Sequence, residues 1–599
     1  MQLSLENIKN PAHYTGNEWN MIKKDPAHVA VRFAFCFPDT YDVGMSHLGL
    51  KLLYDILNRR EDCYCERAFA PWPDREAALR QAGVKLATLE TETPLCDFDI
   101  IGFTLQYELS FSNILQMLDL GGIPMLCADR GDMDSIVIAG GPCACNPDPL
   151  ADFIDLFMLG DGEEVIGQIV EHVKTCRAKG LSRRATLILA AQTLRGVYAP
   201  GAYGGEPIPG VPATVTRCVI PSLEESAYPD AFVVPYAQAV HDRVVLEVFR
   251  GCTRGCRFCQ AGMLYRPIRE RSVDTLMRQA HALVDSTGYD EIGLCSLSTG
   301  DYSGVRELLP RLVNDFAPQG VSLSLPSMRL DAMPGDYLAH IAAVRKSGLT
   351  FAPEAGSQRL RDVINKNITH EDFLDSLRQA YQAGWSQIKL YFMIGLPTET
   401  QEDLQGIVDL VRESVALFRQ TPPQGPRKPL SVSVSVSTFV PKPHTPFQWF
   451  GQNTMEEIQQ KQQFLRGALR FGGVRFSSHD PKVSMLEAAF ARGDRALGHV
   501  LLAAYQLGCR FDGWSEHFNL ERWRQAFEAC GSSVEAYAQK NFEKEESMPW
   551  DAMDYGITRE FLWREYAAAM LAETTPDCRN GCHNCGVSRI MEGGCCMCG

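Results

Sequence analysis

Three cysteines between Cys252 and Cys259 are the residues of this chain best suited to chemistry. Cys252, Cys256 and Cys259 have the spacing C-x3-C-x2-C in the segment EVFRGCTRGCRFCQAG, directly after an expected strand. Three thiolates on one loop can each bind one iron of a four-iron cluster and leave the fourth iron open for a small molecule. The alternative, structural zinc, closes its shell with four ligands, and this loop offers three with no histidine nearby.

The motifs that follow this loop resemble those of the radical S-adenosylmethionine (SAM) superfamily, in the same order. STGD, at 298–301, occupies the place of the family's Gly-Gly-Glu-like stretch, which receives the methionine amino group, but departs from it. SMRLD at 327–331 and PEAGS at 353–357 resemble the ribose and carboxylate contacts, and YFMIGLPTET at 391–400 resembles the element that packs on adenine. A structural ion pair is the alternative role for Arg329 or Glu354. The resemblance implies SAM contacts from Phe258, Thr299, Gly300, Asp301, Ser327, Arg329, Glu354, Ser357, Ile394 and Gly395.

The resemblance also implies a reaction. Members of this superfamily bind SAM at the open iron and cleave it reductively, which gives a 5′-deoxyadenosyl radical that abstracts hydrogen from a substrate. The cofactors supply this radical chemistry, and the protein supplies binding and orientation. The implied electron donor is a flavodoxin or a ferredoxin.

The elements that must position the loop begin with an α/β domain at the N-terminus. Strands are expected at 29–37, 99–105, 135–139 and 154–159, with helices at 49–58 and 163–173 between or after them. This alternation predicts a doubly wound, Rossmann-like parallel sheet over residues 1–199. The Gly- and Pro-rich segment PGAYGGEPIPGVP opens a linker at 200–240.

The N-terminal domain resembles the cobalamin-binding module that precedes many radical SAM domains. The segment 136–164 places Gly140 and Gly141 at a strand end, where glycines let a flat or phosphorylated ligand approach the backbone. The Asp-x-His-x-x-Gly motif of cobalamin proteins is not met, because Met45 and Leu50 replace its Asp and Gly, so His47 can equally cap a helix or pack. The implied cobalamin contacts are Gly44, Ser46, His47, Thr104, Gly140 and Gly141.

A second βα series predicts a full or partial radical SAM (β/α) barrel over residues 241–450. Its strands are expected at 244–249, 291–294, 322–325, 387–391 and 430–439. Helical patterns dominate the region 451–576. Any ligand of the barrel is expected at the carboxyl ends of its strands.

The C-terminal tail, residues 577–599, is a second candidate metal site. Cys578, Cys582 and Cys585 repeat the C-x3-C-x2-C spacing, and Cys595, Cys596 and Cys598 follow a Gly-Gly pair. These six thiols predict a second iron–sulfur cluster or, with His583 available, a zinc site. A redox-active or disordered tail is the remaining alternative.

Composition limits the function further. The chain of 599 residues has 45% apolar and 22% charged residues and a net charge of −15, so a small molecule, a peptide or a protein is favoured as substrate over a nucleic acid. The absence of a signal-peptide pattern and of any apolar run of about 18 residues predicts a cytoplasmic protein without a membrane span. The 21 cysteines then favour metal or redox chemistry.

Together these features predict a radical SAM enzyme with a 4Fe-4S cluster, and a cobalamin-dependent methyl transfer to an unactivated carbon is the leading reaction. Two alternatives remain open. Sulfur insertion or methylthiotransfer would use a C-terminal cluster as the sulfur donor. A non-catalytic iron–sulfur or cobalamin sensor would use the same cofactors without turnover. As a whole the chain resembles an uncharacterised bacterial group of such proteins with a cysteine-rich C-terminus.

Overall fold

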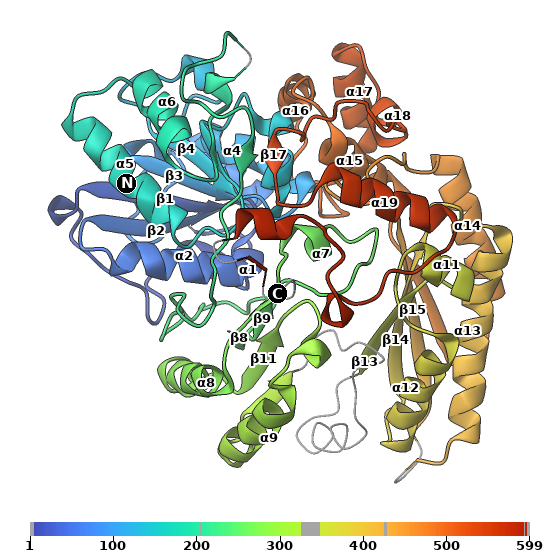
Figure 1. Cartoon of the computed structure of the whole chain (residues 1–599). Coiled ribbons are helices and arrows are strands. Elements are labelled where there is room, and N and C mark those ends of the chain that lie inside the picture. The colour runs from blue at the N-terminus through green and yellow to red at the C-terminus, as the bar shows by residue number, and fades with distance from the viewer. Residues whose placement is uncertain (1–4, 204, 325–347, 424–427, 592–593, 596–599) are drawn as a thin grey trace.

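A computed structural model describes residues 5–203, 205–324, 348–423, 428–591 and 594–595 of the chain. Figure 1 shows an N-terminal sheet with its helices on one side of the molecule and the central strands on the other. The C-terminal helices lie beside the N-terminal sheet, and the last part of the chain returns to the middle of the molecule. None of the described helices has the length and apolar composition of a membrane span.

The N-terminal sheet has six strands in the order β2-β1-β3-β4-β5-β6. The first five strands in this order are parallel, and β6 is antiparallel to β5. The order reverses between β1 and β3, which is the topological switch point of a doubly wound sheet. The prediction of a doubly wound N-terminal domain therefore agrees with the described strands. These are β1 (Val31–Phe37), β2 (Cys63–Phe69), β3 (Ile100–Thr104), β4 (Ile136–Gly140), β5 (Leu156–Met158) and β6 (Val197–Tyr198).

Both faces of this sheet are buried, because successive side chains of a strand point to opposite faces. In β1, Phe33 and Phe35 pack with helices α2, α5 and α6 on one face. Ala34 and Cys36 of the same strand pack on the other face with helices α3 and α4. These helices are α1 (Tyr41–Gly44), α2 (Leu48–Arg59), α3 (Pro73–Ala82), α4 (Phe111–Gly121), α5 (Val165–Ala178) and α6 (Arg183–Thr193).

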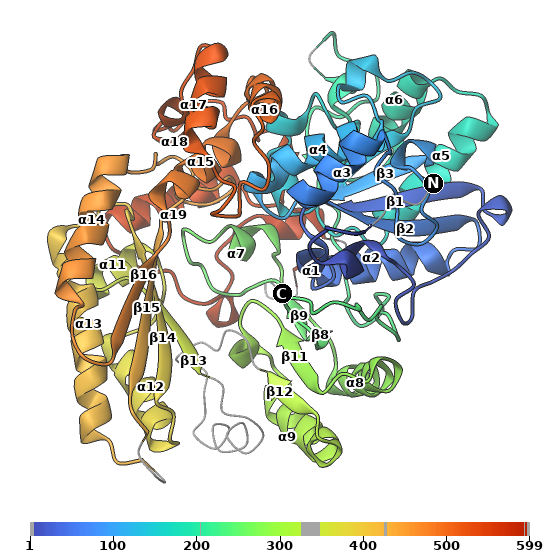
Figure 2. The ribbon, with the colours of Figure 1, turned by 180° about the vertical axis from the view of Figure 1, so that it is seen from behind.

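The C-terminal helices complete the second face of the N-terminal sheet instead of forming a separate body. Phe490, Leu501 and Trp523 belong to the same apolar core as Ile114 and Leu118 of α4. Figure 2 shows α16 beside α4 in the view from behind. The helices of this region are α14 (Met455–Ala468), α15 (Pro481–Arg492), α16 (Leu497–Gln506), α17 (Leu520–Ala529), α18 (Val534–Ala538) and α19 (Arg559–Met570).

The central region contains two parallel sheets, of which one has the order β12-β11-β8 and the other β13-β14-β15-β16. The described strands form two separate sheets, and the full or partial barrel expected from the sequence stays a prediction. β16 also extends the second sheet beyond residue 450, into the region expected to be helical. The strands are β8 (Val244–Glu247), β11 (Glu291–Cys295), β12 (Ser322–Ser324), β13 (Leu349–Glu354), β14 (Gln387–Ile394), β15 (Ser431–Thr438) and β16 (Val474–Ser478).

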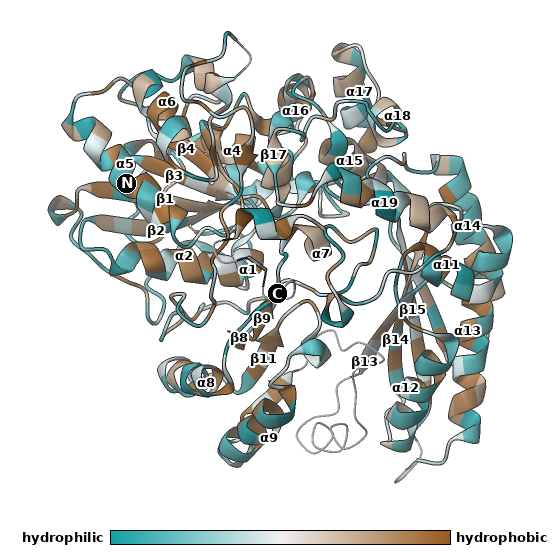
Figure 3. Cartoon of the chain, viewed as in Figure 1, coloured by the Kyte–Doolittle hydropathy of each residue, from teal (hydrophilic) through white to brown (hydrophobic). Residues whose placement is uncertain are grey.

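Helices pack against both central sheets, and the apolar side chains of the strands form buried cores with these helices (Figure 3). The helices are α7 (Gln260–Leu264), α8 (Val273–Thr287), α9 (Val305–Phe316), α11 (Gln358–Val363), α12 (His370–Gln382) and α13 (Gln401–Gln420). Two further strand pairs are short: β9 (Phe249–Arg250) with β10 (Arg269–Glu270), and β7 (Val215–Thr216) with β17 (Met553–Asp554).

The segment expected to be a linker is not a free connection. Tyr228 and Phe232 are buried in the core of the first central sheet. Their burial ties residues 200–240 to the central region.

Candidate active site

The loop that carries the three cysteines begins with a glycine that no other residue can replace without strain. Gly251 has φ +94°, and a Cβ atom there would lie 2.5 Å from the Pro267 carbonyl oxygen and 2.7 Å from the Tyr265 carbonyl oxygen. L-residues rarely adopt this conformation, and the space is already filled. Gly251 therefore sets the path by which the chain leaves β9 and reaches Cys252.

A buried arginine fixes the middle of this loop. Arg257 donates hydrogen bonds to the carbonyl oxygens of Val363 (3.0 Å) and Glu573 (2.8 Å), and its own N–H donates to the carbonyl oxygen of Ile364 (3.0 Å). The Asn365 side chain also donates to the Gly255 carbonyl oxygen (3.1 Å). The cysteine loop is thus attached to the end of α11 and to the segment after α19, so its shape depends on parts of the chain far away in sequence.

The last cysteine of the loop starts helix α7. The Cys259 sulfur accepts a hydrogen bond from the N–H of Gly262 (3.3 Å), and burial together with the Cys256 and Cys252 thiols raises the pKa of Cys259 to about 12. Such a thiol needs a positive partner before it loses its proton, and a bound metal supplies one. Across the described residues, no three His, Cys, Asp or Glu side chains meet at one point as ligands of a single ion. The all-thiol loop fits a four-iron cluster, in which each thiolate binds a different iron.

Three of the predicted SAM contacts, Glu354, Ile394 and Gly395, lie at the carboxyl ends of β13 and β14, and a fourth, Phe258, belongs to the cysteine loop. Phe258 packs against the apolar cluster that contains Ala355 and Leu396, which are next to Glu354 and Gly395. Glu354 ends β13 with a φ of +65° and forms an ion pair with Lys366 (3.1 Å). Ile394 ends β14, and the N–H of Gly395 donates to the Glu399 carboxylate (2.9 Å). Phe258 is thus near the ends of β13 and β14, whereas the Ile394 side chain is buried in the core of the second central sheet.

The other predicted SAM contacts have structural partners or are not described. Ser357 caps α11 by accepting from the N–H of Leu360 (3.0 Å), and its hydroxyl donates to Asp403. Thr299, Gly300 and Asp301 form a turn after β11. Ser327 and Arg329 lie outside the described residues.

Asp301 is held by two arginines. Arg254 and Arg579 approach its carboxylate at 2.7 Å and 2.8 Å. Burial alone would raise the pKa of Asp301, but the hydrogen bonds from Arg254, Ser298 and Arg579 outweigh it and lower the pKa to about 2. Asp301 is therefore an ionised anchor between the cysteine loop and the tail, and its contact with SAM stays a prediction.

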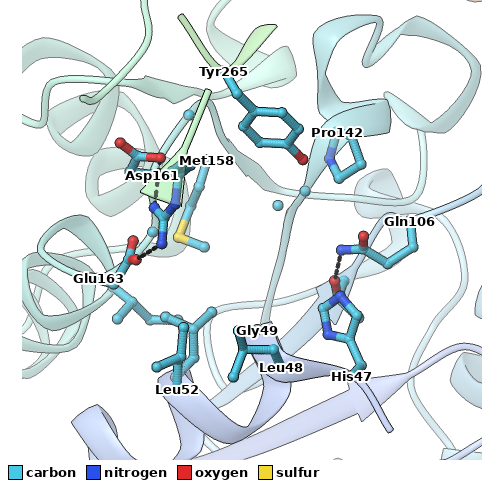
Figure 4. Close-up of a pocket in the computed structure, with 18 of the residues that line it drawn as sticks. His47, Leu48, Gly49, Leu52, Gln106, Pro142, Met158, Asp161, Glu163 and Tyr265 are labelled. Atoms are coloured by element: carbon cyan, nitrogen blue, oxygen red, sulfur yellow. Dashed lines mark hydrogen bonds and ion pairs between the residues drawn. The ribbon is translucent and has the colours of Figure 1, made fainter. Parts of the chain in front are cut away.

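A cavity of about 370 Å³ lies at the switch point of the N-terminal sheet. Its walls come from β1, β3, β4 and the start of α2 on one side, and from residues around β9 and β11 on the other. Figure 4 shows Leu48 and Leu52 on one side of this space and Tyr265 on the opposite side. Ligands of open α/β sheets bind outside the carboxyl ends of the strands at this point.

Glycines shape the N-terminal wall of this cavity, in agreement with the reasoning from sequence. Gly141 has φ +117°, and a Cβ atom there would lie 2.7 Å from the Leu105 carbonyl oxygen. Thr104, Gly140 and Gly141 all line the cavity. Gly44 and Ser46 do not line this cavity: Gly44 is packed against Phe69, and the Ser46 hydroxyl donates to the carbonyl oxygen of Asp42 (2.8 Å), so their contact with cobalamin stays a prediction.

His47 lines the cavity as a helix cap. Its Nδ1 accepts a hydrogen bond from the N–H of Leu50 (3.1 Å) at the start of α2. Burial lowers the pKa of His47 to about 4, although a hydrogen bond with Gln106 opposes the shift. The neutral ring then carries its proton on Nε2, so neither nitrogen offers a free lone pair to a metal.

Sequence reasoning missed the polar wall on the other side of the cavity. Arg250 donates to Asp161 (2.8 Å) and Glu163 (2.7 Å) of the N-terminal domain and to Glu247 (3.0 Å) of β8. The GDGEE segment contributes Asp161 and Glu163, and Arg250 lies two residues before Cys252. The position of Arg250 beside the cysteine loop could have marked it as a candidate, but no local sequence pattern indicates that it contacts the GDGEE segment.

The tail lies directly on the cysteine loop. Cys252 lines a small cavity together with Cys578, Cys582, Cys585 and Cys595. Cys596 and Cys598 lie outside the described residues.

Two family models match the chain. Residues 246–411 match the Radical SAM superfamily, and residues 49–200 match the family described as radical SAM proteins, N-terminal. The chain therefore contains radical SAM family domains, which confirms what the cysteine loop and the following motifs predicted. The match at 49–200 includes β2–β6, and the match at 246–411 includes the cysteine loop.

Two curated relatives illustrate the range of similarity. An uncharacterized protein of Methanocaldococcus jannaschii is 29% identical over 476 residues, which cover 78% of this chain and 90% of that protein. A probable threonylcarbamoyladenosine tRNA methylthiotransferase of Archaeoglobus fulgidus is 24% identical over 180 residues, which cover 28% of this chain and 42% of that protein. The chain thus spans less than half of the methylthiotransferase.

Solved structures with some similarity to this chain include those of two radical SAM enzymes with cobalamin bound. The radical SAM methyltransferase TsrM from Kitasatospora setae, with cobalamin and a 4Fe-4S cluster bound, has a TM-score of 0.44 and 13% identity, covering 68% of this chain and 74% of that chain. The cobalamin-dependent radical SAM enzyme OxsB, with aqua-cobalamin and SAM bound, has a TM-score of 0.46 and 12% identity, covering 90% and 79%. TM-scores of 0.44 and 0.46 are too low to support an argument about the structure of this chain.

Proposed function

We propose that this chain is a radical SAM enzyme that holds a corrinoid in the cavity at the switch point and methylates an unactivated carbon. The observation that carries the proposal is the composition of the cavity wall. Gly140 and Gly141 of the N-terminal sheet face the same space as Phe249, Arg250 and Gly251, the residues that lead into Cys252. A ligand in this cavity would therefore lie beside the loop that would hold the first cluster.

The lining suits a flat, largely apolar ligand. Phe35, Leu52, Ile138 and Met158 contribute apolar surface, and the glycines leave the backbone open. A volume of about 370 Å³ is within the range of small-molecule sites, so the cavity would enclose only part of a cobalamin. Because the His47 ring caps α2, we propose binding without a protein ligand to cobalt.

The residues of this chain would divide the work as follows. Cys252, Cys256 and Cys259 would hold the 4Fe-4S cluster, and Phe258, Glu354, Ile394 and Gly395 would orient SAM at the strand ends. When bound, the cluster and SAM supply a 5′-deoxyadenosyl radical, and a corrinoid would carry the methyl group. The ion-paired Arg250 would close one end of the cavity against water. We propose a flavodoxin or a ferredoxin as electron donor and a small molecule or a peptide as substrate.

Sulfur insertion is a second candidate function, since five cysteines line one small cavity beside the cysteine loop. The names of the methylthiotransferase relatives are in line with it. In that reaction a tail cluster would donate sulfur, and the N-terminal cavity would need no corrinoid.

The test is cofactor analysis of the full chain, purified without oxygen from cells supplied with cobalamin. We expect about one corrin per chain, and 5′-deoxyadenosine formation when a reductant and SAM are added. Gly162→Leu should reduce corrin binding at least tenfold, because a Cβ atom at Gly162 faces Leu53 and Met158 of the cavity wall.

The matched control is Gly167→Leu, on α5 outside the described cavity wall. It should retain the corrin. Wild-type protein that forms 5′-deoxyadenosine without binding a corrin would overturn the methylation proposal and favour sulfur chemistry.

A further inference from the structure

The thiols of the tail lie together on one wall of a cavity that is separate from the corrinoid cavity. Cys578, Cys582, Cys585 and Cys595 line it, and Cys252 with Thr253 forms the facing wall. Cys585 and Cys595 are buried. All cysteines that the structure describes are free, and buried free thiols that gather at one place favour metal ligation over simple packing.

Ion pairs and hydrogen bonds fix the start of the tail to the cysteine loop. The Asp577 carboxylate accepts from the Thr253 hydroxyl (2.9 Å) and pairs with Arg254 (2.9 Å). The N–H of Cys578 donates to the Thr253 carbonyl oxygen (3.1 Å). Because Thr253 and Arg254 are the two residues after Cys252, the position of Cys578 is set by the loop of the first cluster itself.

Contacts to other parts of the chain hold the rest of the tail. The N–H of Thr558 donates to the Cys585 carbonyl oxygen (2.9 Å), and Arg195 of the N-terminal domain donates to the Ile590 carbonyl oxygen (2.6 Å). Arg579 also pairs with Asp301 (2.8 Å). The described part of the tail is therefore attached to all three regions of the molecule.

We propose that Cys578, Cys582, Cys585 and Cys595 bind a second iron–sulfur cluster beside the loop of Cys252. Four thiol ligands are the usual set for such a cluster, and the first three have the same spacing as the cysteines of the first loop. Since no three of these described side chains yet meet at one point, cluster binding draws the tail together around the iron. This proposal rests on the proposed function only in that the neighbouring loop carries a cluster.

The test is iron analysis of the full chain after anaerobic reconstitution with ferrous iron and sulfide. Wild type should hold about eight irons, and a Cys578→Ser, Cys585→Ser double variant about four. Cys582→Ser should also lose the iron of the tail. Because Cys582 is exposed, this variant should fold even where the double variant does not. Cys530→Ser is the matched control, because Cys530 is exposed and lies outside the tail, and it should keep about eight irons.

Cys256→Ser separates the two sites. It should empty the first loop and leave about four irons in the tail, so a failure of the first cluster would be distinguishable from a failure of the second. In reduced wild type the two clusters should broaden each other's electron paramagnetic resonance signals, and this broadening should vanish in the tail variants. Tail variants that keep all of the wild-type iron, or that release zinc instead, would overturn the proposal.

Discussion

At the scale of single residues, Gly251 is a position where any side chain would clash with the surrounding backbone. A methyl group there would meet two carbonyl oxygens of the segment 265–267 that packs under the cysteine loop. We expect Gly251→Ala to cost about 1–3 kcal/mol and to displace Cys252. The predicted result is loss of iron from the first site, measured as iron per chain in a protein that also carries the tail substitutions Cys578→Ser and Cys585→Ser.

Gly288→Ala is the control for this prediction. Gly288 also has a positive φ, +71°, but a Cβ atom there would meet nothing within 4 Å. The two variants share the conformational strain and differ in the steric contact. Equal iron retention in both would show that the contact at Gly251 does not shape the loop.

Single residues also show which parts of the site could be predicted from the sequence. Cysteine spacing is local, so the loop could be predicted from the sequence, and the family match over residues 246–411 confirms the radical SAM assignment. Asp301 pairs with Arg579, 278 positions away, and no local pattern reports such a pair. Ser357 was singled out for SAM, but its observed role is to cap α11.

At the scale of elements, strand β2 shows why part of the fold was missed. Its sequence CYCERAF places Glu66 and Arg67 in the middle of a strand, and the alternation expected of a half-buried strand is absent. Both residues are fully buried, because Arg32 pairs with Glu66 and because Glu18 and Glu90 pair with Arg67. Partners distant in sequence made burial of these charges possible, whereas the apolar strands β1, β3 and β4 were found from their composition.

The contact between α4 and α17 carries a pH-dependent prediction. Asp512 accepts from the Ser112 hydroxyl of α4 (2.7 Å) and from the Trp523 indole of α17 (2.8 Å). Burial raises the pKa of Asp512 to about 6 despite these hydrogen bonds. The folded protein therefore holds this proton more tightly than the unfolded chain, so stability from this group is complete below about pH 4 and is lost as pH rises through 6.

Asp512→Asn should remove the loss of stability that wild type shows as the pH rises through 6. A shift of about two pKa units corresponds to about 3 kcal/mol, so we expect the variant to be more stable than wild type at pH 7.5 and to show a flatter pH profile between 4 and 7. Chemical denaturation of the full chain at several pH values measures it. Asp285→Asn, at an exposed carboxylate, is the control and should follow wild type. A variant profile as steep as that of wild type would contradict the assignment.

At the scale of the whole molecule, a polar contact beside the cavity at the switch point joins the N-terminal and central regions. Arg250 pairs with Asp161 and Glu163 on the N-terminal side and with Glu247 on the central side, and all four side chains are largely buried. Arg250→Met takes its partner from the Glu163 carboxylate, while Asp161 keeps its ion pair with Arg269 and Glu247 keeps Arg271 at 3.7 Å. Unpaired buried charges are costly, so we expect a loss of about 3–5 kcal/mol in unfolding free energy.

The cavity should respond to the same substitution. Arg250 lines it, and its substitution removes the guanidinium that joins Glu163 of the N-terminal wall to Glu247 of the central wall. We expect corrin binding by Arg250→Met to fall at least tenfold, measured by titration of the reconstituted chain with cobalamin. Arg311→Met is the matched control, because Arg311 pairs with Asp274 and Glu307 at an exposed site on α9, where ion pairs contribute little. Wild-type corrin affinity in Arg250→Met would mean that the ligand does not depend on the contact between the two regions.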